Sequence, residues 1–189
     1  MSYKVGYFVG SLSSTSINRK LAQALVKLGA DGVEFTEIPI KDLPLYSADY
    51  DADYPPEGRA LKDAIAATDA LLFVTPEYNR SIPGGLKNAI DWASRPWGQN
   101  SFDHKPTAII GASMGAIGTA VAQQSLRAVM AFCNARQMTA PEAYIHYTDS
   151  MFDAEDNCTN PDTEEFLRGF MREFDEHSRR VFSVLPAKR

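Results

Sequence analysis

Hydroxyl side chains are concentrated in the segment from Gly10 to Arg19, which reads Gly-Ser-Leu-Ser-Ser-Thr-Ser-Ile-Asn-Arg. Five Ser or Thr residues and one Asn stand here, directly before a stretch with helical spacing. Hydroxyl donors, free backbone N–H groups and the positive end of a helix dipole together can hold a phosphate. The alternative is that Ser16 only caps the helix within a polar loop. The segment matches neither GxxxxGK[ST] nor GxGxxG, which disfavours a nucleoside triphosphate or a dinucleotide on a Rossmann fingerprint.

A second segment, Thr75–Asn88, reads Thr-Pro-Glu-Tyr-Asn-Arg-Ser-Ile-Pro-Gly-Gly-Leu-Lys-Asn. Two prolines and two glycines predict an irregular backbone with several amides free to face a ligand. Tyr78 offers an aromatic surface to a planar ring. The same residues also suit a packed loop, with Pro83 as an ordinary first-turn helix proline.

The third segment, Gly111–Gly115, is a literal G-x-S-x-G, the pattern of a hydrolase nucleophile elbow. A triad would join Ser113 to His177 and to one of three acids, Asp149, Asp153 or Asp156. His177 falls in a long amphipathic stretch near the terminus, and no HGGG-type oxyanion segment is present. The glycines equally suit a loop that passes close to a flat ligand, and we favour this second interpretation.

Strand-length apolar runs alternate with longer amphipathic stretches along the chain. The predicted strands are Lys4–Gly10, Val33–Ile38, Asp69–Thr75, Lys105–Ala112 and Met138–Ile145, the last interrupted near Pro141. The predicted helices are Ser16–Leu28, Glu57–Ala67, Pro83–Ser94, Thr119–Arg136 and Thr163–Leu185. This order predicts an α/β fold with a doubly wound parallel sheet, helices on both faces and one domain over residues 1–189.

Ligands of such a sheet bind beyond the carboxyl ends of its strands. The three segments follow the first, third and fourth predicted strands, so we expect them to meet at that edge. Another stretch, Pro39–Pro56, reads as a long loop rich in Pro, Asp and Tyr.

Composition and sequence patterns exclude several other classes of protein. The chain is 44% hydrophobic and 23% charged, as globular proteins are, and its net charge of −5 argues against a nucleic-acid partner. No apolar run approaches a membrane span, and no signal peptide is evident at the start. Cys133 and Cys158 form no CxxC pair, and the three histidines lie far apart, so we expect no metal site and a cytoplasmic protein.

At these segments the sequence resembles the NADPH-dependent FMN reductase family of flavodoxin-like fold, which includes bacterial quinone, chromate and azo-dye reductases. The matching motifs are Gly10-Ser-Leu-x-x-x-Ser-x-Asn-Arg-x-Leu-Ala22, Pro76-Glu-Tyr-Asn-x-Ser-x-Pro-Gly-Gly-Leu-Lys-Asn-Ala-Ile-Asp-Trp92 and Ser113-Met-Gly-x-Ile-Gly118. The resemblance implies a three-layer sandwich around a five-stranded parallel sheet of order 2-1-3-4-5. It covers about Val5 to Arg136, and the C-terminal quarter matches only in general pattern.

The resemblance also implies the cofactor site. The first loop would hold the FMN phosphate through Ser and Asn side chains and amides, at Ser11, Ser13, Ser16, Ile17 and Asn18. The isoalloxazine would be approached by Pro76, Glu77, Tyr78 and Asn79, and bordered by the loop around Ser113. The family often has Arg at the position of Ser13, so this chain lacks a fixed positive charge there.

The implied activity is an oxidoreductase in which hydride passes from NADPH or NADH through FMN N5 to a quinone, azo compound, metal oxyanion or similar acceptor, by a ping-pong mechanism. No side chain is expected to act as a nucleophile or general base. A flavin-binding electron carrier without turnover of its own is the alternative, with the serine hydrolase behind it. Family members are usually dimers or tetramers with the flavin at a subunit interface, and we expect a homodimer or homotetramer here. The Pro39–Pro56 loop and the Trp92–Trp97 segment are the expected interface material.

Overall fold

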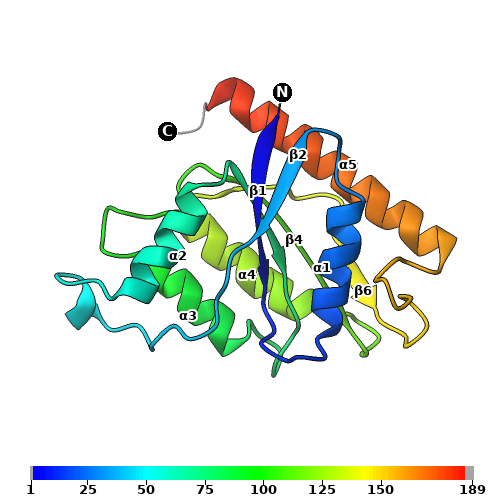
Figure 1. Ribbon diagram of the computed structural model, residues 1–189, viewed down its shortest axis with the longest axis horizontal. Coiled ribbons are helices and arrows are strands. Elements are labelled where there is room, and N and C mark those ends of the chain that lie inside the picture. The colour runs from blue at the N-terminus through cyan, green and yellow to red at the C-terminus, as the bar shows by residue number, and fades with distance from the viewer. Residues whose placement is uncertain (1, 186–189) are drawn as a thin grey trace.

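The computed structural model describes residues 2–185. Its core is a parallel sheet in which the strands are ordered β2-β1-β3-β4-β5, and a sixth strand, β6, also pairs with β4 (Figure 1). The strands are β1 (Tyr3–Val9), β2 (Val33–Glu37), β3 (Ala70–Val74), β4 (Pro106–Ser113), β5 (Arg136–Gln137) and β6 (Tyr144–His146). The flavodoxin-like order 2-1-3-4-5 is therefore confirmed.

The described residues also form five α-helices and one short 3-10 helix, and the last α-helix follows the last strand. They are α1 (Ile17–Lys27), α2 (Pro56–Ala66), α3 (Gly84–Ala93), α4 (Ala120–Phe132), α5 (Pro161–Val184) and the 3-10 helix η1 (Ala48–Tyr50). Among residues 2–185, none of the helices combines the length and apolarity that a bilayer crossing requires.

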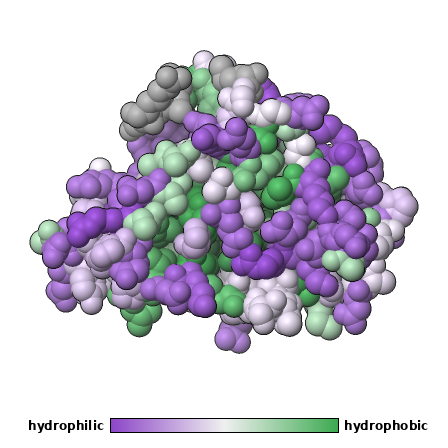
Figure 2. Space-filling model, in the orientation of Figure 1, coloured by the Kyte–Doolittle hydropathy of each residue, from purple (hydrophilic) through white to green (hydrophobic). Residues whose placement is uncertain are grey.

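Helices cover both faces of the sheet, which explains why its central strands are apolar along their whole length. Every residue of β3 is buried. On one face, Leu21 of α1 and Phe170 of α5 pack in one hydrophobic core. On the other face, Ile65 of α2 and Leu126 of α4 belong to a second core, which α3 completes. Hydrophilic side chains cover the outside of α1 and α5, on the right of the view in Figure 2.

The last strand position is filled by two short strands instead of one. β5 pairs with the start of β4 and β6 with its end, at Ser113↔His146, while residues 138–143 leave the sheet between them. The predicted interruption near Pro141 is confirmed, but the strand begins earlier, at Arg136. The preceding helix was predicted to run to Arg136 and ends at Phe132, shortly before Asn134 takes a positive φ of 56°.

The loop of residues 38–55 is long, as predicted, and folds against α3. The rings of Tyr46, Tyr50 and Tyr54 surround Trp92 with centroid distances of 5.2, 5.6 and 4.9 Å. Trp92 is completely buried and its Nε1 donates to Pro44 O at 2.7 Å. The prediction of this region as interface material is thus wrong for Trp92, which is a core residue, whereas Trp97 is 78% exposed.

Candidate functional site

The loop after β1 surrounds the N-terminus of α1. Ser16 is the N-cap of α1, and its Oγ accepts a hydrogen bond from Arg19 N at 3.3 Å. Ile17 and Asn18 occupy the first two helical positions, where backbone N–H groups have no acceptor inside the helix. These two N–H groups and the helix dipole therefore favour an anion at this point.

The hydroxyl groups of this loop lie close to one another. Ser13 N donates to Ser11 Oγ at 3.3 Å, and Ser13 Oγ is 3.2 Å from Thr15 Oγ1. Ser11 and Ser16 are nearly buried, whereas Ser13 and Thr15 are exposed. Residues 10–16 contain no Lys or Arg, so the donors that face an anion here are neutral. Such a donor set fits a phosphate that is held by hydrogen bonds and a helix terminus.

The Asn18 side chain has a structural task that the sequence pattern did not reveal. Its Nδ2 donates to Ala112 O at 2.9 Å, and its Oδ1 accepts from Ala112 N at 2.9 Å. Asn18 is buried, and both ends of its amide are used by one residue of β4. Its backbone N–H remains as the group that can face a phosphate.

The second predicted segment contains a tight turn directly after β3. Tyr78 and Ser81 exchange two backbone hydrogen bonds of 3.1 and 3.0 Å, and the intervening Asn79 and Arg80 both have positive φ, 51° and 61°. Positive φ at both central residues is the mark of a type I′ hairpin turn. The Tyr78 hydroxyl lies 3.4 Å from Ser11 Oγ, so the turn reaches the hydroxyl-rich loop. The structure thus brings the first and second predicted segments together.

Glu77 joins this turn to the start of α4. Its Oε2 accepts from Val121 N and Ala122 N, both at 3.0 Å, and its Oε1 from Arg80 Nη1 at 3.0 Å. The Glu77 side chain is only 8% exposed. It caps a helix that begins more than forty residues later in the chain, which no local motif could indicate. Glu77 therefore holds the turn in place relative to α4.

The first glycine of the G-x-S-x-G motif lies inside β4 and lets two strand ends approach. A Cβ on Gly111 would lie 2.0 Å from Thr75 O and 2.4 Å from Thr119 Oγ1. Gly118 has a positive φ of 59°, and a Cβ there would lie 2.7 Å from Tyr144 C. These glycines therefore serve close backbone packing.

The hydrolase alternative is wrong. β4 runs regularly to Ser113 and pairs there with β6, so no sharp strand-to-helix turn exposes the hydroxyl. His177 Nε2 donates to Arg136 O, and Arg136 pairs with Pro106 at the opposite end of β4. The two ends of β4, Pro106 and Ser113, are seven residue steps apart, about 23 Å, so His177 cannot reach Ser113.

Exposed apolar side chains lie on the loops at this edge of the sheet. They are Leu12, Tyr78, Met114 and Ile117, with exposures of 57, 49, 71 and 47%. Leu12 also lies over Gly85 at the start of α3. Apolar residues that stay exposed beside polar donors are typical of a ligand-binding edge.

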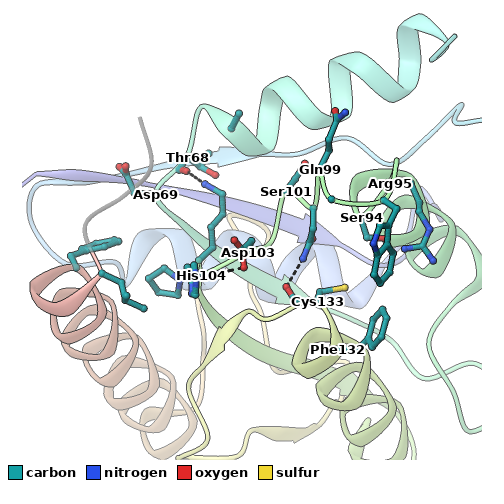
Figure 3. A pocket seen from close by; sticks show the side chains of 18 residues that line it. Thr68, Asp69, Ser94, Arg95, Gln99, Ser101, Asp103, His104, Phe132 and Cys133 are labelled. Atoms are coloured by element: carbon teal, nitrogen blue, oxygen red, sulfur yellow. Dashed lines mark hydrogen bonds and ion pairs between the residues drawn. The ribbon is translucent and has the colours of Figure 1, made fainter. Parts of the chain in front are cut away.

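A hollow of about 940 Å³ lies at the opposite edge of the sheet, where β3 and β4 begin (Figure 3). Residues on its wall include Asp69, Arg95, His104 and Phe132. Lys105 crosses it to donate to Thr68 O, and burial lowers the pKa of this amine below its ordinary value. None of the predicted site residues lines this hollow, so its size alone does not make it the candidate site.

Comparison with known proteins identifies the family of this chain. Residues 3–149 match the model of the NADPH-dependent FMN reductase family. The chain is 51% identical over 174 residues to 2-hydroxy-1,4-benzoquinone reductase of a Burkholderia species, covering 92% of this chain and 95% of that protein. It is 44% identical over 173 residues to a quinone reductase of Pseudomonas putida, covering 91% and 92%.

Among solved structures, the flavoenzyme NAD(P)H:(acceptor) oxidoreductase FerB from Paracoccus denitrificans superimposes with a TM-score of 0.91 at 44% identity. The match covers 95% of this chain and 98% of that one. The chain therefore belongs to the NADPH-dependent FMN reductase family and is an FMN-dependent enzyme that oxidises a nicotinamide nucleotide.

Proposed function

We propose that the protein reduces small quinones with NADH or NADPH, and that its FMN lies at the carboxyl edge of the sheet. The observation that carries this proposal is the meeting of the neutral donor loop after β1 with the Tyr78 turn after β3, joined at 3.4 Å. Quinones are named as acceptors of two similar proteins, at 51% and 44% identity.

In this proposal the FMN phosphate is held by the first loop. Ser11, Ser13 and Ser16 would contribute hydroxyl groups, and Ile17 and Asn18 their backbone N–H groups. The position of these amides at the start of α1 supports the assignment. Ser13 adds no charge where the family often has Arg, so the helix dipole and neutral donors would carry the binding.

The ring system would lie against the second loop. Pro76, Tyr78 and Asn79 would border it, and Ser113 would lie at its far side. Glu77 would act through position, because its carboxylate already accepts two amides of α4. The fixed amides of a tight turn can stabilise negative charge on a reduced ring without reorganisation.

FMN, when bound, supplies the acceptance and donation of hydride. The chain's own contribution is to orient flat reactants and exclude water, and the apolar side chains of Leu12, Met114 and Ile117 suit the stacking of a quinone. Hydride transfer on the flavin requires no side chain that acts as a nucleophile or general base. We also propose a cytoplasmic location and a homodimer or homotetramer, which the need for a nicotinamide nucleotide and the exposed Trp97 support.

The test is steady-state oxidation of NADH and NADPH by 1,4-benzoquinone with purified FMN-loaded protein and no partner protein. We expect turnover with both nucleotides that depends on FMN and yields hydroquinone. A flavin carrier would take up FMN but show almost no turnover, and this result would reject the proposal.

A further inference from the structure

Arg80 occupies a backbone position that disfavours its side chain. Its φ is 61°, at the second central residue of the Tyr78–Ser81 turn, where glycine is the favoured residue. A non-glycine residue is strained in this conformation because its Cβ crowds the following carbonyl oxygen. The Arg80 side chain is 68% exposed, so burial of apolar surface does not offset this strain. Strained positions of this kind tend to be retained where the side chain has a function.

Arg80 also supplies positive charge at an edge that otherwise lacks it. It is the one Lys or Arg in the three loops that converge there, residues 10–16, 75–83 and 114–119. Arg19, at the start of α1, is paired with Glu37 at 2.7 Å. The protein has a net charge of −5, and NADH and NADPH are both anions. Arg80 therefore supplies the main electrostatic attraction for a nucleotide that approaches this edge.

The contacts of Arg80 leave most of its guanidinium available. Nη1 donates to Glu77 Oε1 at 3.0 Å, which fixes one side of the group. Arg carries five N–H donors in a planar fork that matches the oxygens of a phosphate. Since Glu77 is itself held by amides of α4, this single ion pair orients the Arg80 guanidinium, and little further side-chain entropy is lost when a phosphate binds.

On the basis of the proposed function, we infer that Arg80 binds the pyrophosphate of the incoming nicotinamide nucleotide. The turn borders the proposed ring site, and one ribose separates the nicotinamide from the pyrophosphate. The 2′-phosphate of NADPH lies farther away, on the adenosine ribose. Arg80 would thus serve NADH and NADPH alike and hold the dihydronicotinamide over the ring.

The test uses Arg80→Gly, because glycine suits the backbone of this turn and should preserve its shape. In FMN-loaded protein we expect the dissociation constants of NADH and NADPH, from rapid-mixing reduction of the flavin, to rise about tenfold each. Binding of ADP-ribose, measured by calorimetry, should weaken by a similar factor. Reduction by 1-benzyl-1,4-dihydronicotinamide, which has no phosphate, should stay within about twofold of wild type, as should FMN affinity.

Arg59→Gln is the matched control, since Arg59 is an exposed arginine paired with Asp53 on the surface of α2, and its loss should change none of these values. Unchanged NADH and NADPH binding in Arg80→Gly would overturn the inference, as would an effect confined to NADPH, which would assign Arg80 to the 2′-phosphate. Slower reduction by the phosphate-free donor would also overturn it. If wild-type protein fails to react with either nucleotide, the proposed function itself fails.

Discussion

At the scale of single residues, Asn18 belongs both to the candidate site and to the packing of α1 against β4. Its side-chain amide makes two hydrogen bonds of 2.9 Å with the backbone of Ala112, while its own N–H stands at the start of α1. The Asn18 side chain thus links the start of α1 to β4, while the Asn18 backbone N–H can donate to a phosphate. A buried amide with both ends paired contributes more than an exposed one, because either partner left alone would be desolvated without compensation.

Asn18→Asp should therefore lower the free energy of unfolding of the FMN-free protein by about 2–4 kcal/mol, because the new carboxylate oxygen would face the Ala112 carbonyl without a proton between them. Urea unfolding followed by circular dichroism measures this loss. Ser13→Ala, an exposed change in the same loop, should stay within about 0.5 kcal/mol of wild type. Equal stability of Asn18→Asp and wild type would show that the bridge to β4 is not made.

The residue types of the site could be predicted from the sequence, but their long-range contacts could not. Ser11, Ser16 and Tyr78 stand where strands were predicted to end, and the structure places Tyr78 beside Ser11. The bonds from Asn18 to Ala112 and from Glu77 to α4 join residues 94 and 44 or more positions apart. Nothing in a local pattern distinguishes an Asn or Glu that binds a ligand from one that holds a distant backbone.

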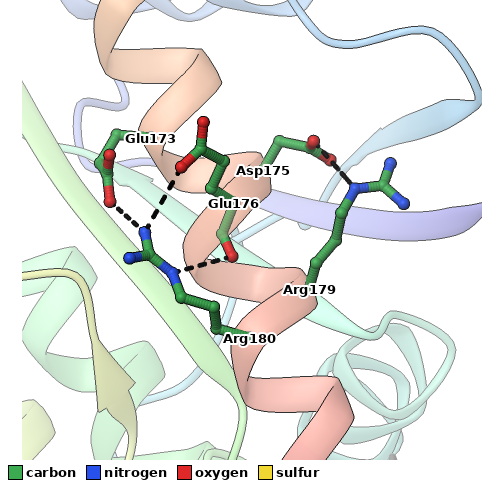
Figure 4. Close-up of polar contacts among 5 residues, drawn as sticks. All are labelled: Glu173, Asp175, Glu176, Arg179 and Arg180. Atoms are coloured by element: carbon green, nitrogen blue, oxygen red, sulfur yellow. Dashed lines mark hydrogen bonds and ion pairs between the residues drawn. The ribbon is translucent and has the colours of Figure 1, made fainter.

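At the scale of elements, α5 closes the fold against the first strand. Asp175 accepts from Tyr3 OH at 3.0 Å. Asp175 also accepts from Arg179 Nε at 2.9 Å, while Arg180 pairs with Glu173 and Glu176 along α5 (Figure 4). The exposed pairs contribute little each. The buried Tyr3 contact is the stronger link between the two ends of the described chain.

This link should make stability fall in alkali. Burial, followed by the negative charge of Asp175, raises the pKa of Tyr3 above its ordinary value near 10. The unfolded chain then loses the Tyr3 proton first, so the contribution of Tyr3 is complete below about pH 10 and is lost as the pH rises further. We expect the stability difference between wild type and Tyr3→Phe to shrink above about pH 10, by up to about 1.4 kcal/mol per pH unit.

Urea unfolding of both proteins between about pH 8 and about pH 11 tests this expectation. Tyr54, whose pKa burial also raises, and Lys105, whose pKa burial lowers, are present in both proteins and cancel in the difference. A difference that stays constant or grows with pH would contradict the Tyr3–Asp175 contact.

Element order was predictable because each strand is an apolar run between turn residues. β3 is buried on both faces and stood out as Ala-Leu-Leu-Phe-Val. The end of α4 was placed too late, because Asn134, whose positive φ follows the helix end, lies within an otherwise helical pattern. Trp92 was placed at an interface because its proximity to Pro96 and Trp97 suggested exposure, whereas three tyrosines of the preceding loop enclose it.

At the scale of the whole molecule, the two edges of the sheet differ in character. The carboxyl edge carries hydroxyls, free helix-terminal amides and exposed apolar side chains on three converging loops. The opposite edge has a recess of about 940 Å³ with mixed charges on its wall. In open parallel sheets the carboxyl edge is where ligands bind, and the donor chemistry of this chain agrees with that rule.

A crystal structure of the FMN complex would show at which of these two edges the cofactor binds. We expect the phosphate within hydrogen-bonding distance of the Ile17 and Asn18 amides, with the ring against Pro76–Asn79. FMN found in the recess beside Lys105 and Phe132, with the loop of residues 10–16 empty, would contradict this expectation.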